Sequence, residues 1–187
     1  MKRLLKTKYH IVFLLSSIVI ATSLSCERDD ICAESTLTTP RLLIEFYDAT
    51  STDDLKNVPR LTLYGEGLVT DPTVDTDTTI VYNANANSAE LPLIIGIEGE
   101  TTTTRYIIEK DTNLRLDEDD TTQSNIDILE IAYVSELQYV SRACGYKSVF
   151  NELTVIFDND GDTWISSIQV IETEINNENT VHVKIYH

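Results

Sequence analysis

Apolar and polar side chains alternate with a period of two in several segments after residue 40. The pattern is clearest in Arg41–Tyr47 (RLLIEFY), Arg60–Tyr64 (RLTLY) and Thr180–Tyr186 (TVHVKIY). Because neighbouring side chains of a strand point to opposite faces, each segment would gather its apolar side chains on one face. Ile126–Val134 (IDILEIAYV) could also form an amphipathic helix, but its Ile, Val and Tyr content favours a strand.

Two pairs of these segments are predicted to form hairpins. Asn159-Asp160-Gly161 separates Glu152–Asp158 from Thr163–Ile175 and has the composition of a tight hairpin turn. Leu91–Ile97 and Thr104–Lys110 are separated by a polar, turn-forming stretch and are predicted to form the other hairpin.

The spacing of these segments predicts the fold class. It gives about nine or ten short strands without a helix after the first 40 residues. We therefore predict an all-β domain over residues 41–187, built as an antiparallel β-sandwich. An immunoglobulin-like arrangement is one form of this sandwich, and a barrel is the alternative.

The first 25 residues have the order of a secretory signal. Met1–Lys8 is basic, Ile11–Ile20 is apolar, and Ala21–Ser25 consists mainly of small residues. The apolar run is shorter than the roughly 20 residues that span a bilayer. We predict that residues 1–25 are a signal peptide that is removed; an uncleaved anchor helix over Tyr9–Leu24 is the alternative.

The residues around Cys26 predict lipid anchoring. Ser23-Leu24-Ser25-Cys26 resembles a bacterial lipobox, in which a Cys after small residues is acylated and becomes the first residue. Acyl chains hold a protein firmly when two or more are attached. Glu27-Arg28-Asp29-Asp30 resembles the export tag of surface lipoproteins in the Bacteroidota. We predict an N-terminal linker over residues 26–40 and an outer-membrane location, at the cell surface or on the periplasmic face.

The predicted acylation of Cys26 decides which of the three cysteines can form a disulfide. If Cys26 is acylated, Cys32 and Cys144 are left as one pair. Disulfides persist outside the cytoplasm, so an exported chain favours a bond between these two residues. Two buried free thiols are the alternative.

Charge limits the partners that the protein can bind. The formal net charge is −17, and removal of residues 1–25 leaves 10 basic groups against 31 acidic ones, a net of −21. Because nucleic-acid binding depends on neutralising phosphates with Lys and Arg, nucleic acid is not expected as a partner.

No catalytic group stands out from the sequence. Asp158, Asp160 and Asp162 are weak candidates for calcium, since the EF-hand spacing places Ser167 where the bidentate Glu belongs. No cofactor is predicted. The sole Trp, Trp164, is expected in the core of a sandwich.

Several segments together resemble an uncharacterised lipoprotein family of the Bacteroidota, catalogued as domain of unknown function 6452. The resemblance implies an anchored protein with a paired Cys and supplies no activity. Its most specific part is Ser141–Tyr146 (SRACGY). The segments that carry it are Cys26–Cys32, Thr39–Asp48, Tyr139–Lys147 and Glu178–Tyr186.

We therefore predict a membrane-anchored lipoprotein that acts as a binding or envelope-structural module and not as an enzyme. Its partners would be the lipid bilayer, through acylated Cys26, and an unknown protein or glycan. The alternatives are an envelope-polymer hydrolase and a weak calcium-binding surface protein. A pocket lined by a carboxylate and His182 would favour the enzyme, whereas an exposed apolar or aromatic patch would favour an interface.

Overall fold

The computed structural model describes residues 31–33, 38–69, 78–112, 124–158 and 161–187. The chain divides into two compact units. The first unit consists of the chain up to Thr36 together with Val140–Gly145. The second unit contains the rest, Leu37–Tyr139 and Tyr146–His187.

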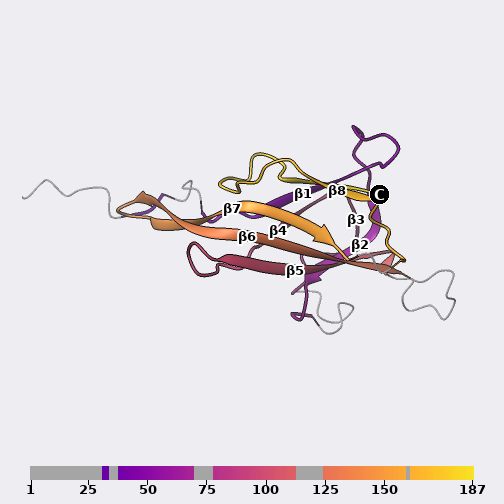
Figure 1. Cartoon of the computed structure of the whole chain (residues 1–187), viewed down its shortest axis with the longest axis horizontal. Helices are drawn as coiled ribbons and strands as arrows, with labels where there is room; N and C mark the ends of the chain where they lie inside the picture. Colours follow the sequence, from indigo (N-terminus) through magenta and orange to yellow (C-terminus); the bar gives the residue numbers. More distant parts are fainter. Residues whose placement is uncertain (1–30, 34–37, 70–77, 113–123, 159–160) are drawn as a thin grey trace, which may run out of the picture. The chain divides into compact units, whose positions relative to one another are not determined.

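The described residues form nine β-strands and no helix, which confirms the predicted all-β class (Figure 1). The strands belong to two sheets, as expected for a β-sandwich. Their bounds are β1 Leu42–Tyr47, β2 Val58–Gly65, β3 Val81–Ala86, β4 Ser88–Leu91, β5 Thr101–Lys110, β6 Asn125–Ser141, β7 Gly145–Phe157, β8 Ser167–Val170 and β9 Val183–Tyr186.

The four-stranded sheet has the order β4-β1-β9-β8. In it β1 lies antiparallel to β4 but parallel to β9, with Ile44 opposite Val183 and Tyr47 opposite Tyr186. Among the described strands, this parallel pair joins an early strand of the chain to a late one.

The five-stranded sheet has the order β3-β2-β5-β6-β7. In it β5 and β6 pair antiparallel from Thr101 opposite Val134 to Lys110 opposite Asn125. An immunoglobulin sandwich places its first two strands side by side in one sheet. Here β1 and β2 belong to different sheets, so the similarity to immunoglobulin domains ends at the sandwich architecture.

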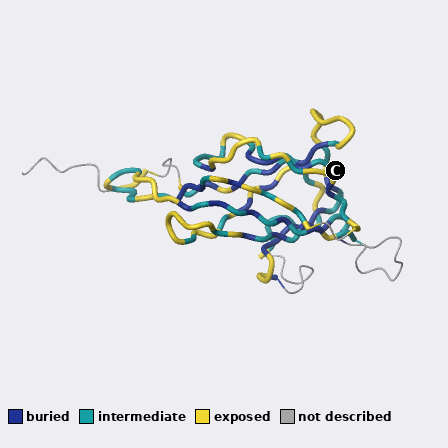
Figure 2. Tube along the Cα trace, in the orientation of Figure 1, coloured by how far each residue is buried: buried dark blue, intermediate teal, exposed yellow. Residues whose placement is uncertain are grey.

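The core consists of buried apolar residues from both sheets, and buried residues alternate with less buried ones along the strands (Figure 2). On β1, Leu42, Ile44 and Phe46 are fully or almost fully buried, as the alternation predicted. Trp164 packs against Phe46 with ring centroids 6.1 Å apart, in agreement with the expected core position. Burial of each large apolar side chain stabilises the fold by about 1.5–3 kcal/mol.

The predicted hairpin around Asn159-Asp160-Gly161 is wrong for the strands next to the turn, although farther away Phe150 pairs antiparallel with Ile175 and the N–H of Leu153 donates to the Thr173 carbonyl at 3.0 Å. The strand before it, β7, lies in the five-stranded sheet, whereas β8 after it lies in the four-stranded sheet. Asp127 of β6 explains the crossing, because its Oδ2 accepts hydrogen bonds from the backbone N–H groups of Trp164 and Ile165 at 3.1 and 2.9 Å. These bonds fix the chain on its way from one sheet to the other.

The predicted hairpin of Leu91–Ile97 with Thr104–Lys110 is also wrong. The first strand ends at Leu91 and pairs with β1, while β5 pairs with β2 and β6. Pro92 has no N–H group to continue the ladder. Residues 92–97 leave the first sheet as a non-strand segment before the chain enters the second.

Candidate functional site

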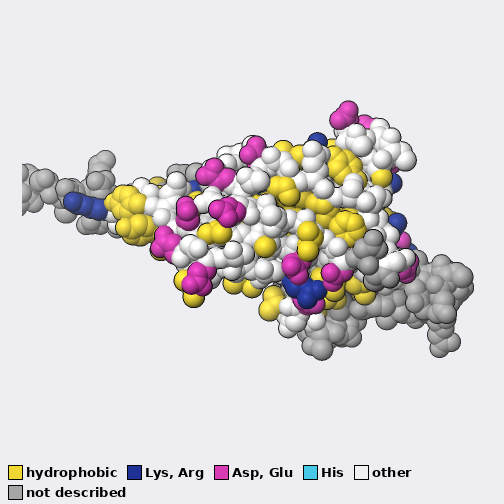
Figure 3. Space-filling model, viewed as in Figure 1, with side chains coloured by type: hydrophobic (Ala, Val, Ile, Leu, Met, Phe, Trp, Pro, Cys, Tyr) yellow, Lys and Arg dark blue, Asp and Glu magenta, His cyan; other side chains and the backbone are white. Residues whose placement is uncertain are grey.

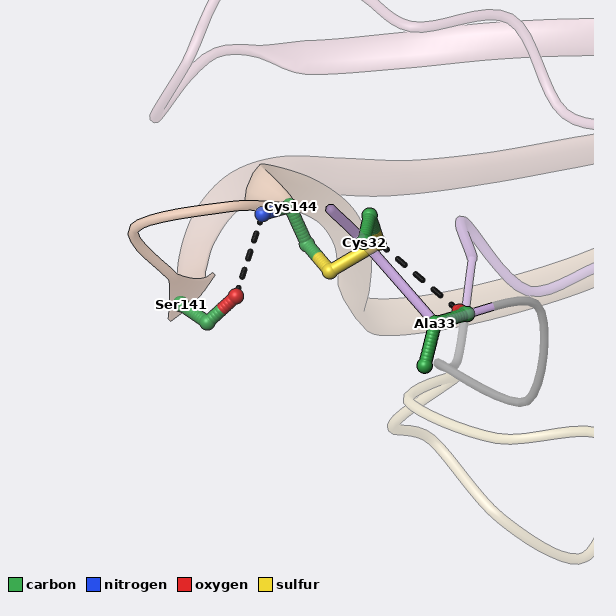
Figure 4. Close-up of a disulfide and its surroundings, with 4 residues drawn as sticks. All are labelled: Cys32, Ala33, Ser141 and Cys144. Carbon is green, nitrogen blue, oxygen red and sulfur yellow. Dashed lines mark hydrogen bonds between the residues drawn. A yellow bond between two sulfur atoms is a disulfide. The ribbon is translucent and has the colours of Figure 1, made fainter. Parts of the chain in front are cut away.

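The structure joins Cys32 to Cys144 by a disulfide, which confirms the pairing expected from the cysteine count (Figure 4). Both residues belong to the first unit. The bond closes a sequence separation of 112 residues. It attaches the start of the described chain to the turn between β6 and β7.

The turn that carries Cys144 is built for a tight reversal. Three residues separate the end of β6 from the start of β7, and the Oγ atom of Ser141 accepts a hydrogen bond from the backbone N–H of Cys144 at 3.0 Å (Figure 4). Gly145 follows with a φ of 70°, in the left-handed region that three-residue hairpin loops require and that glycine adopts without strain. Sequence analysis of SRACGY had identified the family resemblance but not this turn.

The predicted signal peptide and the acylation site Cys26 lie outside the described residues, as does most of the 26–40 linker. Lipidation and export therefore stay predictions. Within the part of the chain that the structure describes, no helix is long and apolar enough to cross a membrane.

The weak calcium candidates gain no support. Asp158 pairs with Arg105 at 3.1 Å, and Asp160 lies outside the described residues. Asp162 is exposed to solvent. Among the residues that the structure describes, no group of three or more His, Cys, Asp or Glu side chains is arranged to hold a metal ion.

His182 is buried and serves the packing of the strands. Its Nδ1 atom accepts a hydrogen bond from the backbone N–H of Leu43 at 3.0 Å. Burial lowers the pKa of the imidazole. An imidazole that accepts at Nδ1 is neutral and carries its proton on Nε2. His182 does not line either of the described pockets.

The most distinctive surface feature is the segment Pro92–Ile97, which we call the isoleucine segment. It is not a strand, so side chains of β5 and β6 provide partners for its backbone. The carbonyl of Pro92 accepts from the hydroxyl of Tyr106, and the N–H of Gly96 donates to the Oγ atom of Ser135 at 3.3 Å. The segment is thus held by inward-pointing hydroxyl groups of the second unit.

The backbone of Ile94 and the hydroxyls of Thr104 and Tyr133 form a ring of three hydrogen bonds. The N–H of Ile94 donates to Thr104 Oγ1 at 3.3 Å, and the Tyr133 hydroxyl donates to the Ile94 carbonyl at 2.7 Å. The two hydroxyls lie 2.6 Å apart. Because the Tyr133 proton is given to Ile94, Thr104 must be the donor between them. Burial raises the pKa of Tyr133, which keeps this proton in place.

The close approach of this segment to β5 depends on Gly96. A Cβ atom at Gly96 would lie 1.8 Å from Oγ1 of Thr102, far inside van der Waals contact. Only glycine allows the backbone to come this near without a shift of its neighbours. The sequence signal was therefore present in LPLIIGI, where Gly interrupts the apolar run.

The isoleucine segment presents an apolar surface. Ile94, Ile95 and Ile97 each expose more than half of their side-chain surface, and Leu68 exposes 76%. On the visible face of the molecule, hydrophobic side chains reach the surface between acidic ones (Figure 3). Scattered exposed apolar residues are ordinary, but three within four positions of one fixed segment form a patch.

A groove of about 550 Å³ is lined by Ile94 of this segment, whereas Ile95 lines a separate, smaller pocket. The residues that line it are largely apolar and come from the second unit: Gly65, Glu66, Leu68, Thr78, Ile80, Pro92, Leu93, Ile94, Thr103, Thr104, Arg105 and Tyr106. Its charged residues are paired with each other, since Arg105 contacts Glu66 at 3.2 Å. The groove therefore offers mainly apolar contacts to a ligand.

Residues 60–187 match a family of unknown function, DUF6452. The chain belongs to this family. The match includes Tyr139–Lys147 and Glu178–Tyr186, two of the segments on which the resemblance rested, whereas the segments before residue 60 lie outside it. Comparisons with curated proteins and with solved structures give no match.

Membership of the DUF6452 family covers β2 from Arg60 onward, the isoleucine segment, β5 and the β6–β7 turn. It therefore includes the hydroxyl groups that hold the segment. The family assigns no activity, so the function must be inferred from the surface itself.

Proposed function

We propose that this protein is a lipid-anchored binding module of the bacterial cell envelope that acts without catalysis. Acylated Cys26 would hold it at the outer membrane, on the cell surface or on the periplasmic face. The isoleucine segment and the adjoining groove would bind a partner. The observation that carries the binding role is the exposure of three isoleucines on a fixed segment, one of which, Ile94, lines an apolar groove.

The way in which the segment is held supports a binding role. Exposed apolar side chains on a loose loop would collapse inward or lose conformational freedom on binding. Here the backbone around Ile94 is fixed by the hydroxyls of Thr104 and Tyr133. A surface that is already ordered pays little entropy when it binds, which strengthens association.

The chemistry of the surface favours a protein partner over a glycan. Sugars are bound by aromatic stacking together with many hydrogen bonds, whereas Ile side chains offer only apolar contact. The groove provides room for apolar side chains of the partner, and its volume lies within the roughly 300–1,000 Å³ of common ligand pockets. We therefore propose a protein that inserts apolar side chains next to Ile94 and Leu68.

The hydrolase alternative has less support than the binding module. Its expected signature was a pocket lined by a carboxylate and His182. The groove contains one carboxylate, Glu66, but this is paired with Arg105, and His182 is buried between β1 and β9 residues. Among the described residues, no cluster of acidic side chains supports the calcium alternative.

Site-specific crosslinking on intact cells tests the binding surface. A photo-reactive amino acid would replace Ile97 on the isoleucine segment in the full-length protein. The matched control places the same group at Ile156 of β7, which is also exposed and lies outside both the isoleucine segment and the groove. We expect a discrete adduct with one protein from position 97 after irradiation.

The control decides the result. An adduct from position 97 that is absent from position 156 supports the proposed surface. Identical adducts from both positions, or none from position 97, would overturn it. Mass analysis of the native protein tests the anchor separately, since an unacylated Cys26 with residues 1–25 still attached would remove the lipid assignment.

A further inference from the structure

The strands on either side of the β6–β7 turn carry an exposed aromatic pair. Tyr139 of β6 and Tyr146 of β7 lie with ring centroids 5.4 Å apart at an interplanar angle of 69°. They expose 58% and 65% of their surface. Tyrosine has an apolar ring and a polar hydroxyl, and it is enriched where proteins meet the interface between lipid and water.

The charge of this part of the chain differs from the rest. No acidic residue occurs between Glu136 and Glu152, and this is the longest acid-free stretch after Cys26 in a chain with 31 acidic residues. The stretch contains Arg142 and Lys147, and the ammonium group of Lys147 donates to the backbone carbonyl of Asn176 at 2.8 Å. Basic side chains next to an interface favour contact with anionic lipid headgroups. The aromatic pair therefore lies in a stretch without carboxylates, which elsewhere in the chain would repel anionic headgroups.

Covalent connections place the pair near the predicted anchor. Tyr146 follows two residues after Cys144, and Cys144 is bonded to Cys32 with a Cα–Cα distance of 4.8 Å. Cys26 precedes Cys32 by six residues, which can extend to at most about 22 Å. A tether of this length gives the attached surface an effective concentration on the order of millimolar. Even a weak affinity of this surface for lipid would then be enough to keep it bound to the bilayer.

We propose that Tyr139 and Tyr146 dock on the surface of the lipid bilayer to which the protein is anchored. The occupant of this aromatic pair is the headgroup region, with the rings inserted and the nearby basic side chains facing anionic lipids. This inference rests on the proposed anchoring through Cys26. It assigns to the DUF6452 chain a second membrane contact besides the acyl chains.

Fluorescence quenching of the full-length acylated protein in vesicles tests the contact. The vesicles contain phosphatidylcholine with about 30% phosphatidylglycerol, in the manner used to mimic anionic surfaces, and a fraction of the lipid carries brominated chains. The test variant is Tyr146→Trp. The matched control is Ile156→Trp, because Ile156 is 58% exposed, close to the 65% of Tyr146, but lies beyond the acid-free stretch. The native Trp164 contributes the same background to both.

We expect bromine to quench the emission of Tyr146→Trp and not that of Ile156→Trp. The quenching of Tyr146→Trp should weaken when phosphatidylglycerol is omitted, by about fivefold in surface affinity for each basic side chain involved. Adding Tyr139→Ser to Tyr146→Trp should reduce the quenching further. Equal quenching in the two Trp variants, or none in Tyr146→Trp, would overturn the inference.

Flotation of the same samples separates this result from the anchor. If the protein fails to float with the vesicles, the lipid anchor itself is refuted and the docking inference falls with it. If the protein floats but Tyr146→Trp is not quenched, the anchor stands and the docking of the tyrosine pair is refuted.

Discussion

Leu43 and His182 exchange two hydrogen bonds although 139 residues separate them in the chain. The N–H of Leu43 donates to Nδ1 of His182, and the N–H of His182 donates to the Leu43 carbonyl, each at 3.0 Å. His182 directly precedes β9, so these bonds align the last strand with β1. They explain how a parallel pair can form at the point where the chain ends.

His182→Ala should reduce stability because it leaves the Leu43 N–H without its acceptor. An unsatisfied buried donor costs about 1–3 kcal/mol. His182→Asn should cost less, since its side-chain oxygen can take the place of Nδ1. Urea denaturation at pH 7.5 measures both. Equal losses in the two variants would show that the acceptor does not matter and that packing alone does.

The pH dependence of stability gives a second prediction for His182. Burial lowers the pKa of this imidazole in the folded protein below its ordinary value of 6.5. The unfolded chain then binds a proton before the folded one, so the contribution is intact above about pH 6.5 and falls as the pH drops through that value. Wild type should be less stable at pH 5.5 than at 7.5, and His182→Asn should show a smaller difference. His187→Gln is the control for the half-buried imidazole of His187, whose pKa partial burial also lowers.

The strands could be predicted from the sequence, but their partners could not. Alternation in RLLIEFY identified β1 and its inward side chains, because burial on one face imposes a period of two. Partner choice depended on single contacts between distant residues. Asp127 redirects the chain at Trp164, and His182 aligns β9 with Leu43. Neither contact leaves a local pattern in the sequence.

The candidate site was only partly predictable for the same reason. The cysteine number and the predicted export were enough to predict the pairing of Cys32 with Cys144. The isoleucine segment was predicted as a strand, since its apolar run resembles one. Its actual conformation depends on Thr104 and Tyr133, which come from two later strands. No feature of the run itself indicates that hydroxyls would replace a sheet ladder.

Asp127→Ala should destabilise the protein more than an ordinary surface change. The carboxylate accepts from the N–H groups of Trp164 and Ile165, and its loss leaves both donors without this acceptor. We expect a loss of about 2–4 kcal/mol, because one of these two bonds is buried and the other is partly buried. Asp127→Asn, which retains one side-chain oxygen, should lose less. Thermal or urea unfolding measures the difference, and an unaffected Asp127→Ala protein would contradict the role given to this residue in the crossing.

Tyr133→Phe should release the isoleucine segment while leaving the sandwich folded. The substitution removes the hydroxyl that donates to the Ile94 carbonyl and accepts from Thr104. Stability should fall by about 1 kcal/mol, the usual net value of one hydrogen bond. Hydrogen exchange of the Ile94 and Gly96 amides should accelerate relative to that of the β5–β6 ladder. Unchanged exchange would show that the segment is held by packing instead.

Arg41 and Glu178 provide a prediction at lower pH. Hydrogen bonding from Arg41 lowers the pKa of the Glu178 carboxyl to about 2 from its ordinary 4.5. The pair therefore stabilises the fold above about pH 4.5, and this contribution is lost as the pH falls toward 2. Because both side chains are about a third or more exposed, the effect should not exceed about 1 kcal/mol and should shrink in high salt. Glu178→Gln measured from pH 6 to 3 tests it, with Glu90→Gln as the control for the other carboxylate near Arg41.

The disulfide should contribute more to stability than any of these single contacts. Cys32 and Cys144 close a sequence separation of 112 residues, and a loop of about 100 residues corresponds to about 4.7 kcal/mol in the chain-entropy model. The double variant Cys32→Ala/Cys144→Ala should lose about 2–5 kcal/mol in urea denaturation. A reductant should produce a similar loss in wild type and none in the double variant. If the double variant unfolds at the wild-type urea concentration, the bond serves to attach the N-terminal segment to the β6–β7 turn without stabilising the sandwich.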